Sequence, residues 1–573
     1  MANLMNLVGE EVAMGVEGVS LSIWFLLGAV LVFFMQCGFA MVETGFTRAK
    51  NAGNIIMKNL MDFCIGAIVF VGIGFSLMMS ENYIFGIIGL PNMQIFDDYA
   101  TFVSSGTAAS FVFNLVFCAT AATIVSGAMA ERTKFVAYCI YSAVISAIVY
   151  PIEAGWIWNP NGWLAQLGFT DFAGSCAIHM VGGITALIGA IFLGPRLGKY
   201  YKDAKGRVRA NAIQGHSLTL GALGCFILWF GWYGFNGAAA GSVTDLASIF
   251  VTTTLAPAAA TVACMFFTWW KVGKPDVSMS LNASLAGLVA ITAGCAYVDA
   301  KGSIIIGAVA GILVAVAVDI LDNKFHIDDP VGAVAVHGVN GIWGTIAVGI
   351  FDRDLGLLYS GTFDLLLVQI LGVLAVGGFT AACMTLVFYL IKKTVGLRVS
   401  KEDEILGLDI SEHGLSSAYA DFLPSAPIHS VEDEFDVDMD EIVPVKLSDA
   451  VERDGKHYTK ISIICNEEKF GTLKDVMALI GVTGMTVSNV VGCGVQKGKT
   501  GNYRGVRMSM NLLPKVQIDI VVSTVDPGLV VAAAQKALYR GKVGDGKIFV
   551  SDVTDVMRVR TGSMGQEALD NEE

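Results

Sequence analysis

Long apolar segments separated by short polar loops dominate the first two thirds of the chain. Up to about residue 395 there are eleven of them, each close to the ~20 residues that a helix needs to span a bilayer. They lie near residues 20–42, 60–80, 105–130, 135–152, 172–194, 216–240, 249–270, 278–297, 303–322, 332–351 and 364–391. Only 15% of the residues are charged, compared with roughly 25% in a soluble domain. The sequence therefore predicts an α-helical membrane protein with eleven transmembrane helices.

The charges of the connecting loops predict how these helices are oriented. Loops after odd-numbered segments carry most of the Lys and Arg residues, among them Arg48, Lys58, Arg132 and Arg196. Loops after even-numbered segments carry only Lys301 and Arg353. Because basic loops stay on the cytoplasmic side, we expect the N-terminus outside the cell and the C-terminus inside. The net charge of −13 argues against nucleic acid as a partner.

A titratable residue recurs in the same frame in two of the apolar segments. The stretches DFAGSCAIHMVGG (171–183) and DPVGAVAVHGVNG (329–341) share the pattern D-x-x-G-x-x-x-x-H-x-V-x-G. His179 lies in the fifth segment and His337 in the tenth, and these segments run in opposite directions. Each histidine follows its aspartate by about 12 Å along a helix, so both are expected near mid-membrane. The pattern predicts an inverted 5+5 repeat with a binding site or path at its interface.

A buried imidazole can also serve packing alone, as a neutral donor to a helix carbonyl. That alternative explains one histidine more easily than two in matching positions. An ionisable group in the membrane interior is costly and marks a functional site. Two facing imidazoles can share a proton and line a narrow path for a small polar species.

Five segments before residue 422 resemble signature sequences of the Amt/Mep/Rh family of ammonium transporters. They are GFAMVETGFTRAKNAGNIIMKN (38–59), FNLVFCATAATIVSGAMAER (113–132), DFAGSCAIH (171–179), LWFGWYGFN (228–236) and DDPVGAVAVHGVNGIWG (328–344). The resemblance implies transport of ammonium or ammonia by a homotrimer in which each protomer has its own pore. It also implies that His179 and His337 are the paired pore histidines.

The same resemblance assigns further pore residues. Phe117 and Phe235 match the two stacked phenylalanines that gate the outer mouth. Trp158 matches the aromatic residue that recruits ammonium, as expected for a cation over an aromatic face. Asp171 matches the essential aspartate of the family, and it also fits a plain helix N-cap. Ala239 stands where the family often has a serine, and an alanine side chain cannot accept a hydrogen bond.

The rest of the chain divides by composition. After the transporter region (1–397), residues 398–422 resemble the family's cytoplasmic tail. An acidic segment, EDEFDVDMDE, then lies within residues 423–457, which we interpret as a flexible linker. Residues 458–573 show the alternation of a soluble α/β domain with the order βαββαβ, which is ferredoxin-like.

This last domain resembles the P-II nitrogen-regulatory proteins in GVTGMTV (481–487), LLPKV (512–516), GKVGDGKIFV (541–550) and RVRTG (558–562). The resemblance implies regulation by ATP or ADP, Mg²⁺ and 2-oxoglutarate. Backbone amides of a glycine turn, together with arginines, suit polyphosphate. By match, the nucleotide lies against Gly544, Asp545, Gly546, Lys547, Arg558, Arg560 and Thr486.

The glycine-rich stretch 494–512 resembles the mobile T-loop of P-II proteins. Gln496 matches the ligand of the metal and 2-oxoglutarate, and Lys515 matches a carboxylate partner of 2-oxoglutarate. Arg504 matches the arginine that plugs the cytoplasmic pore mouth. Met508 replaces a modifiable tyrosine, which excludes uridylylation at that position, and Val495 replaces an arginine that often contacts nucleotide.

These resemblances imply an ammonium transporter of the cell membrane that carries its own P-II regulator in the cytoplasm. The alternative is a sensor that binds ammonium without transporting it and signals through the P-II domain, and Ala239 favours this alternative. No catalytic constellation occurs in the tail, so we do not expect an enzyme.

Overall fold

The computed structural model of the chain consists of two compact units, and each is described by itself. Unit 1 comprises Met1–Arg196 and Gln214–Ser400, and unit 2 comprises Leu197–Ile213 and Lys401–Glu573. The described residues are 2–90, 94–203, 205–415, 443–445, 458–482, 484–493, 500–503, 506–509, 512–541 and 543–569.

Unit 1 is a bundle of apolar helices. Among the described residues, ten helices are long and apolar enough to cross a membrane. Their elements are α1 (Ala2–Phe46), η1 (Ala49–Asn51), α2 (Ala52–Val69), η2 (Phe70–Gly74), α3 (Phe75–Met79), α6 (Thr107–Ala128), α7 (Phe135–Val144), η3 (Ile145–Val149), α8 (Tyr150–Trp158), α9 (Trp163–Gln166), η4 (Ser175–Met180), α10 (Val181–Leu193), α11 (Leu218–Gly237), α12 (Val243–Val272), α14 (Ala300–Ile320), η5 (Leu321–Phe325), η6 (Val334–Val339), α15 (Asn340–Phe351) and α17 (Asp364–Lys393).

The eighth predicted segment is the exception in length. It forms α13 (Val277–Thr292), an apolar helix of 16 residues that packs against both α12 and α14. Short elements complete the unit: β1 (Tyr83–Ile84), β2 (Ile88–Gly89), α4 (Gln94–Asp97), α5 (Tyr99–Ser104) and α16 (Leu357–Ser360).

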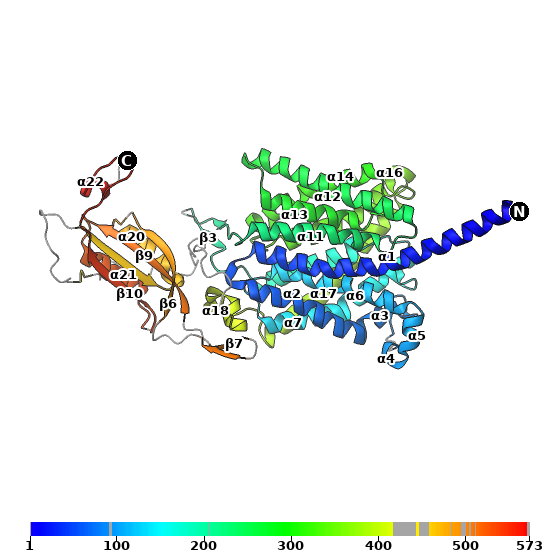
Figure 1. Ribbon diagram of the computed structural model, residues 1–573, viewed down its shortest axis with the longest axis horizontal. Coiled ribbons are helices and arrows are strands. Elements are labelled where there is room, and N and C mark those ends of the chain that lie inside the picture. The colour runs from blue at the N-terminus through cyan, green and yellow to red at the C-terminus, as the bar shows by residue number, and fades with distance from the viewer. Residues whose placement is uncertain are drawn as a thin grey trace. The chain divides into compact units, whose positions relative to one another are not determined.

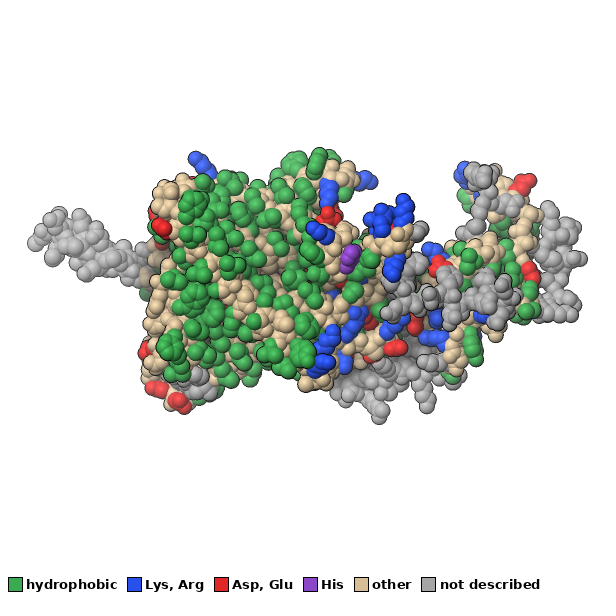
Figure 2. Space-filling view, turned by 180° about the vertical axis from the view of Figure 1, so that it is seen from behind, with side chains coloured by type: hydrophobic (Ala, Val, Ile, Leu, Met, Phe, Trp, Pro, Cys, Tyr) green, Lys and Arg blue, Asp and Glu red, His purple; other side chains and the backbone are tan. Residues whose placement is uncertain are grey.

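The surface of unit 1 suits a bilayer. Figure 2 shows its side covered by hydrophobic side chains, with most Lys and Arg side chains gathered towards one end. Large exposed apolar residues include Ile68, Phe226 and Leu374. Exposed apolar surface of this extent is costly in water and is matched by hydrocarbon. Unit 1 therefore has the surface of a multi-pass membrane protein.

The second span is longer than the sequence predicts. It runs from Ala49 to Met79, whereas the apolar pattern suggests a start near residue 60. The prediction that Lys58 lies in a loop is therefore wrong, because this residue is inside a membrane helix. It is 1% exposed. An isolated buried ammonium group is expensive, so Lys58 needs polar partners inside the bundle.

The repeated motif has the same local structure in both copies. Gly174 and Gly332 have φ of +108° and +81°, a left-handed conformation that glycine adopts without strain. The π-helical segments η4 and η6 follow them and carry His179 and His337. The first glycine of each motif therefore turns the chain into its histidine-bearing helix.

The last glycine of each motif lies where the two copies approach each other. A Cβ on Gly183 would lie 2.1 Å from the backbone nitrogen of Gly338, and one on Gly341 would lie 2.6 Å from the carbonyl oxygen of Ser175. Any larger residue would separate the two helices. These glycines hold the histidine-bearing segments in contact.

The C-terminal part of unit 2 is a four-stranded antiparallel sheet with helices packed on it (Figure 1). The strands are β5 (Thr459–Cys465), β6 (Thr486–Cys493), β9 (Leu512–Val522) and β10 (Gly546–Asp552), and the helices are η8 (Glu467–Lys469), α20 (Phe470–Leu479), α21 (Pro527–Leu538) and α22 (Gln566–Leu569). The strand order β10-β5-β9-β6 is that of the predicted ferredoxin-like fold.

Alternating burial along β5 explains this sheet. Ile461, Ile463 and Cys465 are fully buried, and they pack with Leu473 of α20 and Val530 of α21. Period-two alternation gives a strand one apolar face, and the two helices cover it. The T-loop stretch contains an unpredicted hairpin of β7 (Thr500–Tyr503) and β8 (Val506–Ser509).

The tail and linker are described in part. Residues at the end of unit 1 pair with the loop after α6, where the Lys134 N–H donates to the Leu397 carbonyl and the Val399 N–H donates to the Arg132 carbonyl. Unit 2 also holds β3 (Tyr200–Lys202), β4 (Val208–Ala210), α18 (Lys401–Leu406) and α19 (Leu408–His413). Of the predicted linker only 443–445 is described, and the Val445 N–H donates to the Gly528 carbonyl.

Candidate functional site

The two repeated histidines meet inside the helix bundle. Nδ1 of His179 lies 3.2 Å from Nδ1 of His337, and the rings stack with centroids 5.2 Å apart. Since one nitrogen must donate and the other accept, the pair holds one proton between the two Nδ1 atoms. Nε2 of His179 is buried and has no hydrogen-bond partner among the described residues. This unpartnered atom is therefore available to a small polar ligand.

Aromatic rings form a column leading to the histidines. Phe117 stacks near Phe235, with centroids 4.4 Å apart, and Phe235 lies 5.5 Å from the ring of His179. Trp232 stacks on His179 at 5.1 Å and also lies 5.2 Å from Phe235. Phe117 and Phe235 are 2% and 1% exposed. The two residues predicted to form a gate are thus buried neighbouring rings, and one of them contacts the histidine pair directly.

Trp158 and Asp171 lie at the far end of this column. The Trp158 ring is 6.0 Å from that of Phe117, and its Nε1–H donates to the Asp171 carbonyl. The Asp171 carboxylate accepts four backbone N–H bonds, from residues 174 to 177. Asp171 therefore caps the helix that carries His179 and holds the Trp158 indole beside Phe117. Ala239, the third predicted recruitment residue, is exposed just beyond α11.

A small cavity adjoins His337, and its lining includes none of the rings of the aromatic column. This inner cavity has a volume of about 30 Å³, and its lining includes Phe39, Glu43, Thr123, Asn282, Val331 and His337. A cavity of roughly 10–15 Å³ already holds a water molecule. The two histidines therefore have different surroundings: aromatic rings pack against His179, whereas polar groups line part of the cavity beside His337.

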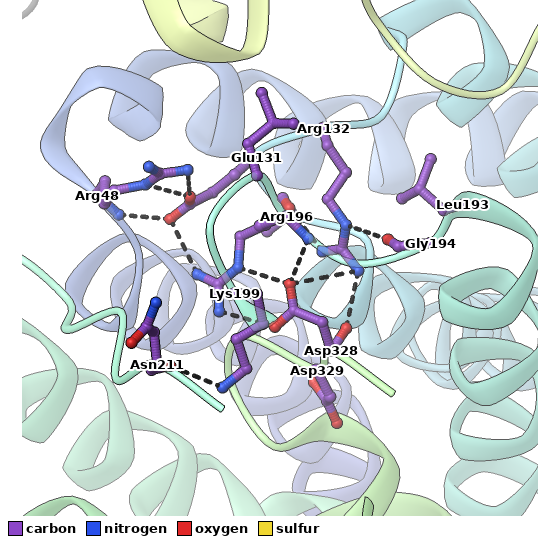
Figure 3. A network of polar contacts seen from close by, with 12 residues as sticks. Arg48, Glu131, Arg132, Leu193, Gly194, Arg196, Lys199, Asn211, Asp328 and Asp329 are labelled. Carbon is purple, nitrogen blue, oxygen red and sulfur yellow. Dashed lines mark hydrogen bonds and ion pairs between the residues drawn. The ribbon is translucent and has the colours of Figure 1, made fainter. Parts of the chain in front are cut away.

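A buried ionic network ties together the chain segments at one end of the bundle (Figure 3). Glu131 pairs with Arg48 at 2.5 Å and Arg196 at 3.4 Å, and Asp328 pairs with Arg196 at 2.9 Å. Arg132 reaches Asp328 at 4.0 Å and donates to its carbonyl. These charges come from the loops after α1, α6 and α10 and from the segment before η6. From the sequence, the three arginines are interpreted only as basic loop residues that indicate the cytoplasmic side, and their ion pairs are not predicted.

The network holds both acids in their charged form. Burial acts to raise the pKa of Glu131, but the guanidinium groups of Arg48 and Arg196 outweigh it and lower the pKa to about 2. Burial likewise opposes ionisation of Asp328, and Arg196 and Arg132 hold its pKa well below the usual range. The segments joined by this network are therefore linked by ion pairs throughout the physiological pH range.

Four of the predicted ligand residues of unit 2 lie at one turn or contact it: Gly544, Asp545, Gly546 and Lys515. Gly544 and Gly546 have φ of +102° and +148°. Lys515 donates to the Gly544 carbonyl and to the Asn466 side chain. Asp545 accepts from Arg540, which also pairs with Glu468. Hydrogen bonds and ion pairs thus connect the turn to the starts of β9 and η8.

The basic residues predicted to bind nucleotide lie at or near the surface of unit 2. Lys547 is exposed at the start of β10, Arg560 is exposed, and Arg558 is half-buried. Thr486 begins β6 and pairs with Asp519. Gln496 and Arg504 lie outside the described residues. Among the residues that the structure describes, no cluster of His, Cys, Asp and Glu is able to hold a metal ion.

The bundle with its buried histidine pair defines a polytopic membrane protein with an internal polar site. The model of the Ammonium Transporter Family matches residues 23–419. The chain belongs to the ammonium transporter family. The model of the nitrogen regulatory protein P-II matches residues 458–563, so a P-II domain follows the transporter domain on the same chain.

Similar proteins agree with this assignment. Ammonium transporter Amt2 of Archaeoglobus fulgidus is 44% identical over 424 residues, covering 70% of this chain and 88% of that protein. Among solved structures, a Sensor Amt Protein is 38% identical with a TM-score of 0.65, covering 70% of this chain and 99% of that chain. Mep2 of Candida albicans is 28% identical with a TM-score of 0.62, covering 72% and 93%.

Proposed function

We propose that this protein conducts ammonium across the cell membrane, with the N-terminus outside and the C-terminus inside. The observation that carries the proposal is the His179–His337 pair at the end of an apolar aromatic column. A bare ammonium ion crossing such a column would pay a large desolvation penalty. Loss of its proton at the outer mouth removes most of that penalty.

Each residue of the aromatic column has a separate role in the proposed transport. Trp158 offers an aromatic face that stabilises a partly desolvated cation by ~0.5–2 kcal/mol. Phe117 and Phe235 exclude water and ions and admit neutral ammonia after a small rotation of their rings. The free Nε2 of His179 then provides a hydrogen-bonding partner for ammonia inside the apolar path.

A second function is favoured by one residue and one relative. Ala239 provides no hydroxyl at the outer mouth, and the Sensor Amt Protein is 38% identical to this chain. In this alternative the membrane part binds ammonium without conducting it, and the bound state is signalled to the P-II domain.

We expect ammonium-evoked current from the purified full-length protein in liposomes. Because the column and the histidines lie within unit 1, removing residues 423–573 should leave the current intact. Replacing His337 by leucine, which cannot share the Nδ1 proton, should reduce it by roughly 100-fold. The measurement is current on solid-supported membranes after an ammonium pulse. No current from either the full or the shortened chain, with ammonium binding retained, supports the sensor instead.

We further propose that the P-II domain faces the cytoplasm and regulates the pore of a homotrimer. Its left-handed glycines Gly544 and Gly546 and the adjoining side chain of Lys547 suit the phosphates of ATP or ADP, and Arg558 and Arg560 would supply further positive charge to them. Gln496 would hold Mg²⁺ and 2-oxoglutarate, and the T-loop with Arg504 would close the cytoplasmic pore mouth when 2-oxoglutarate is scarce.

Replacing Lys515 by methionine is expected to weaken 2-oxoglutarate binding in the presence of Mg-ATP. The substitution removes a charge-assisted hydrogen bond of about 1.5–3 kcal/mol, which corresponds to roughly 10- to 150-fold in Kd. Isothermal titration of the full chain measures the change. Lys474→Met, at an exposed lysine on α20, is the matched control and should bind normally. Equal affinity in both variants would remove Lys515 from the ligand site.

A further inference from the structure

The inner cavity connects the histidine pair to a second buried titratable group. His337 and Glu43 both line this cavity. Glu43 lies on α1 within the span Gly18–Phe46 and is 3% exposed. Its Oε2 accepts a 2.7 Å hydrogen bond from the Ser126 hydroxyl of α6. The volume of about 30 Å³ leaves room for water between the imidazole and the carboxyl group.

Two charged groups on α2 and a tyrosine on α7 lie close to Glu43. Lys58 is near Glu43 and Asp62, interacts electrostatically with both, and donates to the Ser126 carbonyl at 3.3 Å. Its Nζ also lies 5.0 Å from the centre of the Tyr138 ring. The Tyr138 hydroxyl donates to Asp62. Four helices thus direct polar side chains to one place in the membrane interior.

The charges of this cluster do not cancel when all are ionised. Glu43 and Asp62 each carry a carboxylate, and Lys58 provides one ammonium group, so full ionisation leaves one negative charge. An uncompensated charge in this environment is expensive. Asp62 is tied to Tyr138, whereas Glu43 faces the cavity. Glu43 is therefore the carboxylate that can gain or lose a proton through the cavity water.

We propose that Glu43 is the inner proton station of the conduction path, exchanging protons with the His179–His337 pair through the cavity. This inference rests on the proposed transport function and adds the route by which charge crosses. Lys58 and Asp62 on α2, with Tyr138 on α7 and His337 on η6, are the titratable groups that surround it.

The proton balance of one passage is simple. Ammonium leaves its proton at the outer side, and the histidine pair takes up a proton from that side as ammonia passes. The histidine pair protonates cavity water, and that water delivers a proton to the Glu43 carboxylate. Ammonia arriving in the cavity then attacks this proton with its lone pair, so an N–H bond forms as the O–H bond breaks. Ammonium leaves on the inner side, and the carboxylate is restored.

The test separates charge flow from ammonia flow. Glu43→Gln retains the size of the side chain but cannot exchange a proton. In liposomes containing the full chain, we expect an ammonium pulse to give a current roughly 100-fold below wild type. The internal alkalinisation caused by ammonia, corrected for protein-free liposomes, should persist. Glu81→Gln, at an exposed acid outside the bundle core, is the matched control and should conduct as wild type does.

The opposite results are equally clear. Wild-type current in Glu43→Gln would overturn the inference while leaving transport in place, and absence of current and ammonia entry in wild type would overturn transport itself. Glu43→Asp keeps a carboxyl group and should keep most of the current; equal loss in the Asp and Gln variants would assign Glu43 to packing. If Glu43→Gln fails to fold, infrared spectra of the wild type must show a protonated-carboxyl band that changes on addition of ammonium.

Discussion

Replacing Asp171 by alanine is expected to destabilise the protein by several kcal/mol and to disorganise the path at His179. Its two carboxylate oxygens accept four backbone N–H groups, two on each oxygen. Each buried donor left without a partner costs about 1–3 kcal/mol. The Trp158 indole donates to the backbone of the same residue, so its position should change as well.

Thermal unfolding of the detergent-solubilised protein measures this effect. Asp171→Asn should lie between wild type and alanine, because the amide retains one acceptor oxygen but turns an NH₂ group towards the other two donors. Asp276→Ala is the matched control: it removes a half-buried N-cap with one backbone bond, to Met279, and should cost only ~1 kcal/mol. If Asp171→Ala and Asp276→Ala lower the unfolding temperature equally, Asp171 does not act as an acceptor of four stabilising hydrogen bonds.

Replacing Glu131 by glutamine should cost about 3–5 kcal/mol, the range found when one partner of a buried ion pair is removed. The side chain is fully buried between Arg48 and Arg196; Arg48 would lose its carboxylate partner, and Arg196 would keep only Asp328. We expect a large fall in the unfolding temperature. Glu402→Gln, at an exposed position on α18, should leave the unfolding temperature unchanged.

Acid provides an independent check of the same network. The folded-state pKa of Glu131 is lowered from 4.5 to about 2, so its carboxylate stabilises the fold at pH values above 4.5. That contribution is lost as the pH falls from 4.5 towards 2, because the unfolded state takes up the proton first. The wild type should lose stability through this window more steeply than Glu131→Gln. Parallel acid profiles would show that the ion pairs do not stabilise the fold.

The sequence was informative where a pattern repeats. The two D-x-x-G-x-x-x-x-H motifs predicted that His179 and His337 lie at one depth, and the structure brings their Nδ1 atoms within 3.2 Å. The pattern did not explain its own glycines. Gly174 starts a helix at positive φ, and Gly183 permits a backbone approach that only the folded chain reveals.

The polar groups inside the bundle could not be predicted in the same way. A hydropathy pattern ends a segment at the first charge, so Lys58 resembles the edge of a loop although its membrane span begins at Ala49. Glu43 likewise stands near the end of α1 and resembles a boundary residue. Their partners come from α6 and α7, far away in the sequence. Only tertiary contacts show that these charges are enclosed.

The presence of both domains on one chain has a consequence for the cell. A separate regulator is made in its own amount, and its occupancy of a transporter follows its abundance. Here every transporter domain is synthesised together with one P-II domain. Gene expression therefore cannot change their ratio, and dilution cannot separate them. On the proposed function, adjustment of the response is left to the concentrations of the small molecules that the P-II domain would bind.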